Sequence, residues 1–362
     1  MTDAGEVGRT AALDRYFRRE FDTRVSAVEL LHDGLNRNAL VTTASGDRLV
    51  VRRPTAVRDS PLFLDIEQEY RLLGRLHDGP LPVPEPIALC SDPNVLGERF
   101  AVLAHRPGRP VHTGERLPTP FRTPAARGAL VESVIECLAS VHETPVVRVR
   151  DVCPHLDPTA QVRIALDRLA AVERTTDLDV DRLEAVGNRL VELAPRSPAE
   201  AFVHGDFRTA NLLFDASDDP TVTAVLDWET AMVGDPLTEL GYLLVRWHDP
   251  SPPPVALDAM LASVDDAVAS DVRRWHARGL DPFTAEAGSP DRRALITLYE
   301  AATGRTVVRP WYYLAHAGFM LATVWADLHR HRLARDEPSN WPVYVDYLTA
   351  VTVGRLADAG RW

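Results

Sequence analysis

Short apolar runs separated by polar turn residues characterise the first hundred residues of the chain. Residues 11–21 form an amphipathic stretch that predicts a short helix. The runs at residues 28–31, 39–43 and 48–51 are rich in aliphatic and β-branched side chains and predict three strands. Ser45, Gly46 and Asp47 separate the second run from the third, so we expect these two strands to form a hairpin.

A helical pattern and two further strands complete this strand-rich region. Apolar residues recur at helical spacing from Leu62 to Leu76, and Ser60 followed by Pro61 predicts where the helix begins. Residues 87–89 and 100–103 predict strands, and the segment Pro-Gly-Arg-Pro at 107–110 interrupts the pattern. We therefore expect an N-terminal lobe over residues 1–105 and a C-terminal lobe over residues 106–362.

Helical periodicity dominates the larger lobe. Two strand-like runs interrupt it, at residues 201–203 and 222–226. The most apolar segment, residues 311–326, is too short for a membrane span and predicts a buried helix. The pattern as a whole predicts an α+β protein, with a small antiparallel sheet and one main helix in the first lobe and a mostly helical second lobe.

Two polar motifs follow the strand-like runs of the larger lobe. The first, at residues 204–211, contains Asp206 and Asn211; the second, at residues 226–229, contains Asp227. A carboxylate that orients a hydroxyl and two hard oxygen ligands for Mg²⁺ are what phosphoryl transfer requires. Each motif alone could be an ordinary turn or strand end, but their order and their positions after strands favour catalysis. His204 is expected to brace the first loop.

The two motifs resemble those of the aminoglycoside phosphotransferase and choline kinase superfamily, which has a two-lobed fold similar to protein kinases. Nearly the whole chain fits one branch of it, similar to the kinase domain fused to some acyl-CoA dehydrogenases. The matching segments are residues 49–54, 67–70, 225–229, 234–236, 240–244, 247, 298–305 and 311–313. The resemblance implies an N-terminal nucleotide-binding lobe and a C-terminal catalytic and substrate-binding lobe.

The resemblance also implies roles for individual residues in the second lobe. Asp206 would be the catalytic carboxylate, and Asn211 and Asp227 would hold Mg²⁺. Arg208 stands where protein kinases have a lysine that contacts the γ-phosphate. An exposed loop charge is an equally good interpretation of Arg208.

In the first lobe the resemblance implies a site for ATP, from which the chain departs in three ways. The chain contains no lysine, so Arg52, or alternatively Arg53, would replace the lysine that binds phosphate and pairs with Glu69. The other interpretation makes Arg52 and Glu69 exposed surface charges. The phosphate-covering loop has a single glycine, Gly34, supported by Asn36 and Asn38. The adenine-contacting segment from Leu103 to His105 lacks the Met-Glu of many relatives, which leaves the choice between ATP and GTP open.

Composition narrows the function classes further. The 362 residues carry a formal net charge of -12, which disfavours nucleic acid and acidic membranes as partners. Without lysine no Walker A phosphate loop is possible. The three cysteines show no metal-binding or disulfide spacing, and the polar N-terminus is no signal peptide, so we expect a cytoplasmic protein.

The sequence therefore predicts an ATP- and Mg²⁺-dependent phosphotransferase that acts on a small-molecule hydroxyl. The resemblance implies a hydroxy acid or a hydroxyacyl-CoA as acceptor. Alternatives are an aminoglycoside or choline-type kinase and a nucleotide-binding pseudokinase with a regulatory role.

Overall fold

The computed structural model describes residues 3–33, 36–55, 63–196, 198–215 and 220–357. The chain forms two compact units. The first comprises Met1–Gly108 and Thr223–Thr230, and the second comprises Arg109–Val222 and Ala231–Trp362. Residues 223–230 belong to the first unit because their backbone bonds to it: the Val225 N–H donates to the Pro82 carbonyl (2.7 Å).

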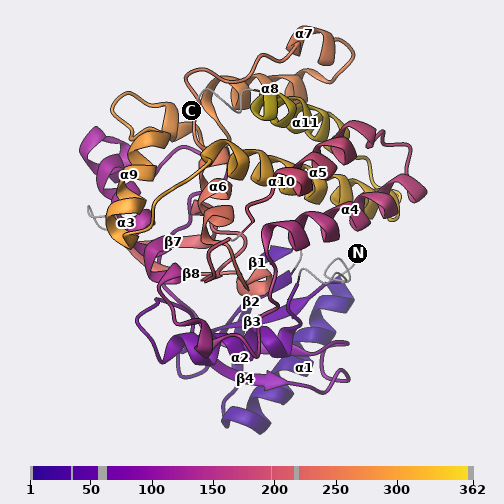
Figure 1. The fold of residues 1–362 in the computed structure, drawn as a ribbon. Helices are drawn as coiled ribbons and strands as arrows, with labels where there is room; N and C mark the ends of the chain where they lie inside the picture. The colour runs from indigo at the N-terminus through magenta and orange to yellow at the C-terminus, as the bar shows by residue number, and fades with distance from the viewer. Residues whose placement is uncertain (1–2, 34–35, 56–62, 197, 216–219, 358–362) are drawn as a thin grey trace. The chain divides into compact units, whose positions relative to one another are not determined.

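A five-stranded antiparallel sheet in the order β1-β2-β3-β5-β4 forms the centre of the first unit (Figure 1). The predicted hairpin is confirmed. The Thr43 N–H donates to the Asp47 carbonyl (2.9 Å), and Gly46 adopts a φ of +91°, a conformation that favours glycine. The strands are β1 (Val25–Asp33), β2 (Asn36–Thr43), β3 (Arg48–Pro54), β4 (Pro86–Cys90) and β5 (Phe100–Ala104).

Two helices pack on this sheet. Tyr16 and Phe17 of α1 (Asp3–Phe21) pack against β-strand residues that include Val51, in one buried cluster. Side chains alternate between the faces of a strand, so Arg52, which follows Val51, points to the other face. There α2 (Ile66–His77) packs against β4 and β5 and supplies the buried Glu69. The alternation of β3 therefore places one charged side chain against α2.

The start of α2 differs from the prediction. The helix begins at Ile66, whereas Ser60 and Pro61 lie outside the described residues. Asp65 caps it: the Asp65 side chain accepts the Gln68 N–H (2.7 Å), and the Gln68 side chain accepts the Asp65 N–H (2.9 Å). This reciprocal capping box satisfies two backbone donors and sets the first turn.

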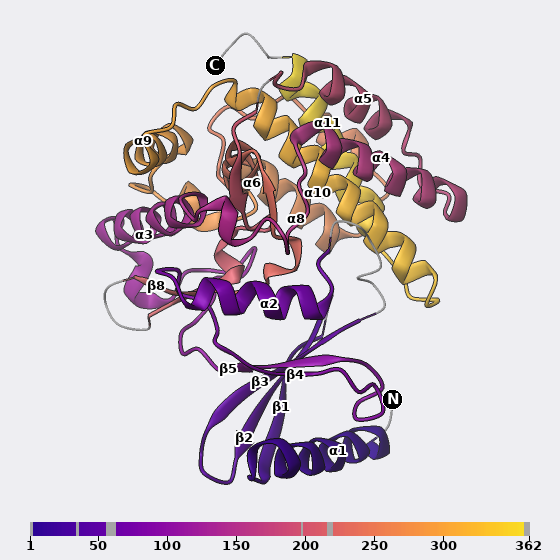
Figure 2. The same cartoon turned by 60° about the horizontal axis from the view of Figure 1, so that its bottom comes forward.

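The second unit is mostly helical, as predicted, and α10 (Pro310–Leu333) lies at its centre (Figures 1 and 2). This helix contacts α4, α5, α6 and α11 and confirms the buried helix expected at residues 311–326. The helices are η2 (Thr119–Arg122), α3 (Pro124–His142), η3 (Val146–Arg148), α4 (Pro158–Thr175), α5 (Asp181–Leu193), η4 (Thr209–Asn211), η5 (Trp228–Thr230, first unit), α6 (Pro236–Arg246), α7 (Leu257–Met260), α8 (Asp266–Arg278), η6 (Pro282–Ala285), α9 (Arg292–Thr303), α10 and α11 (Trp341–Ala357).

A glycine allows α6 to lie close to α10. A Cβ atom at Gly241 would stand 2.5 Å from the Tyr313 carbonyl oxygen, much closer than packed atoms tolerate. The adjacent turn of α6 carries Glu239 and Tyr242. The close approach therefore fixes the helix that supplies two side chains to the loop at residues 204–211.

Four short strands occur beyond the sheet: β6 (Ala201–Val203), β7 (Leu212–Phe214), β8 (Val222–Val225) and β9 (Met232–Gly234). β6 and β8 were expected, whereas β7 and β9 were not, and β9 pairs antiparallel with β6. No helix in the described part of the chain is long and apolar enough to cross a membrane.

Candidate active site

Arg52 and Glu69 form a buried ion pair in the first unit. The Arg52 Nε atom lies 2.8 Å from Oε1 of Glu69, and the side chains are 5% and 3% exposed. The interpretation of both residues as surface charges is therefore wrong. Arg53, the alternative candidate, instead donates from Nη1 to the Leu96 carbonyl (2.9 Å). Of the two candidate arginines, Arg52 is therefore the one that pairs with Glu69.

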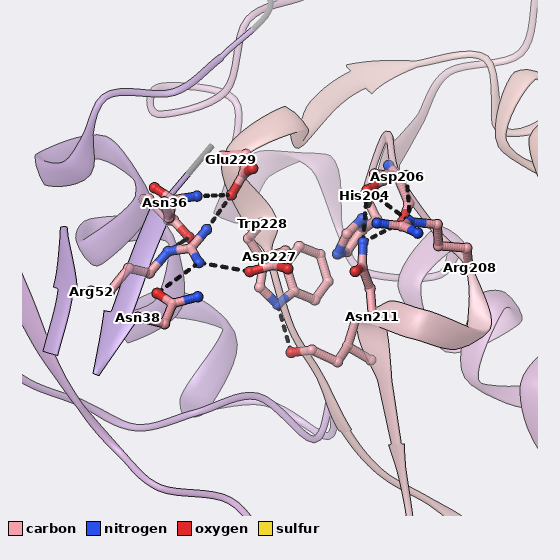
Figure 3. Close-up of polar contacts among 12 residues, drawn as sticks. Asn36, Asn38, Arg52, His204, Asp206, Arg208, Asn211, Asp227, Trp228 and Glu229 are labelled. Carbon is pink, nitrogen blue, oxygen red and sulfur yellow. Dashed lines mark hydrogen bonds and ion pairs between the residues drawn. The ribbon is translucent and has the colours of Figure 1, made fainter. Parts of the chain in front are cut away.

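Two more carboxylates contact the same guanidinium (Figure 3). Nη1 of Arg52 lies 2.6 Å from Oδ1 of Asp227, and Nη2 pairs with Oε2 of Glu229. Burial would lower the pKa of Arg52, but the nearby carboxylates of Glu69, Glu229 and Asp227 outweigh it and raise that pKa. One guanidinium faces three carboxylates, so the cluster retains two excess negative charges, a balance that suits a divalent cation.

Two asparagines of β2 complete this cluster. Asn36 donates from Nδ2 to Oε2 of Glu229 (2.8 Å). Asn38 stands opposite Arg52 in the sheet and accepts a 3.4 Å hydrogen bond from its Nη1. Asn38, predicted to support the phosphate-covering loop, therefore contacts the arginine. Gly34, predicted for the same loop, lies outside the described residues.

Asp227 has the most accessible carboxylate of the cluster, with 35% of its side chain exposed. Its backbone has a φ of +61°, which a non-glycine residue adopts at a cost of about 1–3 kcal/mol and which clusters at functional sites. The neighbouring Trp228 is buried and donates from Nε1 to the Val225 carbonyl (3.0 Å). The buried indole and Arg52 together hold Asp227 in this orientation.

The predicted adenine-contacting segment lies at the end of β5. Leu103 is buried and pairs with Val50 of β3. The His105 N–H donates to the Arg48 carbonyl (3.2 Å), and burial together with the Arg48 charge lowers the pKa of His105. A hydrogen bond from this N–H to a nucleotide would require that contact with Arg48 to open.

The loop at residues 204–211 of the second unit is anchored by a buried glutamate that was not predicted. Glu239 of α6 accepts hydrogen bonds from the backbone N–H groups of His204 and Gly205. Its Oε2 also lies 3.0 Å from Nε2 of His142, which is buried as well. Gly205 has a φ of +86°, which turns the chain toward Asp206.

Asp206 is held at both carboxylate oxygens. Oδ1 accepts a 2.6 Å hydrogen bond from the Tyr242 hydroxyl, and Oδ2 accepts one from Nε of Arg208 (3.2 Å). Burial would raise the pKa of Asp206, but the Arg208 charge and the Tyr242 hydrogen bond outweigh it, and the pKa is lowered. The carboxylate is therefore ionised at neutral pH. Arg208, left open between two interpretations, pairs with this carboxylate and is 31% exposed.

Asn211 closes the loop back onto Asp206. Its Nδ2 donates to the Asp206 carbonyl (2.9 Å) and to Oδ2 (2.8 Å), so its amide oxygen, Oδ1, faces away from Asp206. His204 accepts the Asp206 N–H at Nδ1 (3.2 Å), which confirms its predicted bracing role. Figure 3 shows these side chains. A hard oxygen from Asn211 and the exposed carboxylate of Asp227 suit Mg²⁺ in their chemistry.

Glu239 and Tyr242 were not predicted as partners of the loop at residues 204–211. Both lie on α6, three positions apart, and therefore on one helix face. That spacing was the available signal, but it does not indicate which loop the face contacts. Glu229 was predicted only as part of the second motif and Asn36 only as a support of the phosphate-covering loop, so their contact with each other was not expected.

An antiparallel five-stranded sheet with two helices packed on it, joined to a mostly helical unit with an Asp-Asn loop, defines a phosphotransferase of the kinase-like class. The chain belongs to the phosphotransferase enzyme family, whose model matches residues 26–277.

Similar proteins include acyl-CoA dehydrogenase family member 11 of Homo sapiens, 24% identical over 83% of this chain. The match covers 35% of that protein, so this chain spans about a third of its length. Among solved structures, one assigned as an aminoglycoside phosphotransferase from Ralstonia eutropha has a TM-score of 0.68 and 22% identity, covering 96% of this chain and 98% of that one. The GDP and kanamycin complex of an aminoglycoside phosphotransferase has a TM-score of 0.59 and 16% identity, covering 93% and 96%.

Proposed function

We propose that this protein transfers the γ-phosphoryl group of ATP to a hydroxyl group of a small molecule, with Mg²⁺ as cofactor. The observation that carries the proposal is Asp206, an ionised and partly exposed carboxylate whose two oxygens are oriented by Tyr242 and Arg208. A carboxylate in this state can accept a hydrogen bond from the attacking hydroxyl and then its proton.

The proposal assigns the remaining polar residues to nucleotide and metal. Oδ1 of Asn211 and the carboxylate of Asp227 would hold Mg²⁺, which when bound would neutralise charge on the phosphate oxygens. Arg52 would orient Asp227 and Glu229 through its guanidinium, and Glu69 would fix the arginine in turn. Arg208 would remain beside Asp206, where its charge favours the ionised carboxylate.

The proposal also names the class of acceptor molecule. The similarity to acyl-CoA dehydrogenase family members supports a hydroxy acid or a hydroxyacyl-CoA as acceptor. The kanamycin complex of a structural neighbour supports an aminoglycoside as the alternative. The GDP bound in that complex supports GTP as an alternative phosphoryl donor.

A pseudokinase is the second candidate, because Arg52 is already engaged by three carboxylates and the His105 N–H by Arg48. A regulatory protein that only binds nucleotide would tolerate both features. It would have no use for an oriented base, and Asp206 therefore favours catalysis.

The test is ADP release from Mg-ATP in the presence of hydroxyacyl-CoAs, free hydroxy acids, choline and aminoglycosides. We expect release with an acceptor, and its loss in Asp206→Asn while ATP affinity stays within a few fold. Wild-type protein that binds Mg-ATP but turns over none of these acceptors would favour the pseudokinase. A variant Asp206→Asn that retains full activity would remove the basis of the mechanism.

A further inference from the structure

A cavity of about 450 Å³ in the second unit is lined mainly by charged side chains. It lies between the segment from Gly114 to Arg127 and the region formed by α8 and η6. Its volume is in the range of sites that hold a small molecule. The lining includes five arginines and two glutamates, a net of three positive charges in a chain of formal net charge -12. The arginines are Arg116, Arg122, Arg127, Arg274 and Arg278.

Two of these arginines have carboxylate partners. Arg274 pairs with Asp271 (2.7 Å), and Arg278 pairs with Glu286. A Cβ atom at Gly114 would stand 3.7 Å from Nη2 of Arg274, so this guanidinium lies directly against the glycine. The missing side chain at position 114 therefore leaves space beside a positive charge.

The other three arginines have no carboxylate partner among the described residues. Arg116 and Arg122 are exposed, and Arg122 donates from Nε to the Leu117 carbonyl (2.8 Å). Both guanidinium groups therefore keep N–H donors for a ligand, since each has five. Like charges gathered in one cavity repel one another and attract a counter-anion.

Arg127 is the most unusual of the three because only 5% of it is exposed. Its guanidinium donates to Oγ of Ser289 (2.8 Å) and to two backbone carbonyls, those of Arg122 and Ala287. All three acceptors are neutral, so its hydrogen bonds are satisfied but its charge is not balanced. A buried cation without a counter-charge is costly and indicates an anion nearby.

A second hollow of about 490 Å³ adjoins the first, and the two share Glu115, Arg116, Leu117 and Arg122. The second is also lined by Arg109 and Asp215. The exposed arginines thus stand where two hollows meet, which allows an extended ligand to place its charged groups between them.

The lining segment is joined to the catalytic loop by a short chain of contacts. Thr113, next to Gly114, accepts a hydrogen bond from Nη2 of Arg246, and the Arg246 guanidinium lies 5.9 Å from the centre of the Tyr242 ring. Tyr242 in turn donates to Asp206. The Val111 N–H also donates to the Thr209 carbonyl (3.3 Å) within the loop. The cavity is therefore built on the same framework as the catalytic carboxylate.

We propose that this cavity binds the anionic part of the phosphoryl acceptor, an inference that rests on the proposed phosphotransferase function. The planar guanidinium group of arginine can donate two parallel hydrogen bonds to two oxygens of a phosphate or a carboxylate. Cationic acceptors such as choline and aminoglycosides would be repelled. The anion has two possible sources: the phosphates of a CoA thioester, or the carboxylate of a free hydroxy acid.

The experiment is a calorimetric titration without ATP, using coenzyme A, pyrophosphate, 3-hydroxybutyrate and kanamycin as probes. The titrations are repeated with saturating Mg-ADP, so that binding at the nucleotide site is excluded. The test variant is Arg116→Gln combined with Arg122→Gln; both side chains are exposed, so the fold should tolerate the changes. The matched control is Arg163→Gln, an exposed arginine of α4.

We expect coenzyme A and pyrophosphate to bind the wild-type protein and the Arg163→Gln control equally. Their affinity should fall at least tenfold in the double variant, while Mg-ADP affinity is unchanged. Binding of 3-hydroxybutyrate alone, with the same loss, would assign the cavity to a free acid. Absence of anion binding, equal binding in the double variant, or tight binding of kanamycin would overturn the proposal. Because no turnover is measured, a failure of the phosphotransferase function would show separately, in the ADP-release assay.

Discussion

Arg52→Gln tests whether one guanidinium holds three carboxylates together. The variant removes the charge and keeps a polar side chain, leaving Glu69, Asp227 and Glu229 without their shared cation. In the wild-type protein Arg52 lies 2.8 Å from Glu69 and 2.6 Å from Asp227, and it pairs with Glu229 as well. We expect a large loss of stability in the first unit.

The magnitude follows from the burial of each carboxylate. The side chains of Glu69 and Glu229 are 3% and 9% exposed, so water cannot replace the lost cation there. Removing one partner of a buried ion pair typically costs about 3–5 kcal/mol. Asp227 is 35% exposed and should add little, because solvent screens its charge. We therefore expect Arg52→Gln to lower the free energy of unfolding by about 3–5 kcal/mol at pH 8.

The loss should depend on pH. Carboxylates that lie close together without their shared cation repel one another, and protonation relieves this repulsion. The destabilisation should therefore shrink as the pH falls from 8 toward 5. Lysine can neutralise part of the charge but has a single nitrogen, so Arg52→Lys should fall between the wild type and Arg52→Gln.

Urea unfolding at pH 8 and at pH 5.5 measures these effects. Arg53→Gln is the matched control, since Arg53 contacts a backbone carbonyl rather than this cluster. Removing the excess charge with Glu69→Gln in the Arg52→Gln background should restore part of the lost stability, and this double variant keeps the test valid if the single one folds poorly. A loss below about 1 kcal/mol at pH 8, or an equal loss at both pH values, would refute the reasoning.

Three further predictions concern metal, catalysis and stability. Asp227→Ala should weaken the Mg²⁺ dependence of ATP binding and leave metal-free ATP binding little changed; an unaltered Mg²⁺ titration would exclude it as a ligand. Tyr242→Phe removes the 2.6 Å hydrogen bond that helps to lower the pKa of Asp206, so the acid limb of the kcat/KM profile should move to higher pH, and an unmoved limb would contradict this. Burial lowers the pKa of His316 from the usual histidine value of 6.5 to about 4, so the unfolded chain binds the proton first and the free energy of unfolding should fall by about 3 kcal/mol between pH 6.5 and pH 4. His316→Gln should flatten this part of the urea-derived stability profile, and an unchanged slope would contradict the assignment.

Local sequence patterns were sufficient for much of the fold. The hairpin around Gly46 and the buried helix at residues 311–326 follow from turn chemistry and apolar periodicity, which depend on neighbouring residues only. The strands β7 and β9 are three residues each, too short for alternation to become visible. The start of α2 was misplaced because Ser-Pro is a common helix start, whereas Asp65 forms a reciprocal box with Gln68.

The sequence predicted the candidate site residues Asp206 and Asp227, but it did not predict the side chains that orient them. Asp206 and Asp227 stand in recognisable motifs, whereas their partners are distant in the chain: Tyr242 is 36 residues from Asp206, and Arg52 is 175 residues from Asp227. Such pairs depend on how helices and strands pack, as the approach of α6 to α10 at Gly241 illustrates. A motif thus predicts which side chains can take part in the chemistry. The tertiary contacts determine the protonation state of a carboxylate such as Asp206.

Because the chain contains no lysine, arginine forms the contacts of both the carboxylate cluster and the cavity. A lysine ammonium is a point charge that pairs well with one or two carboxylates, whereas a guanidinium presents donors in a planar fork. Arg52 uses that fork to contact Glu69, Asp227 and Glu229 at separate nitrogens. The same geometry lets Arg127 bond three neutral oxygens while its charge stays unbalanced. Arginine therefore has opposite roles at the two sites. Around Arg52 the carboxylates outnumber the guanidinium, which favours a metal cation. In the cavity lined by Arg127 the guanidinium groups outnumber the carboxylates, which favours an anionic ligand.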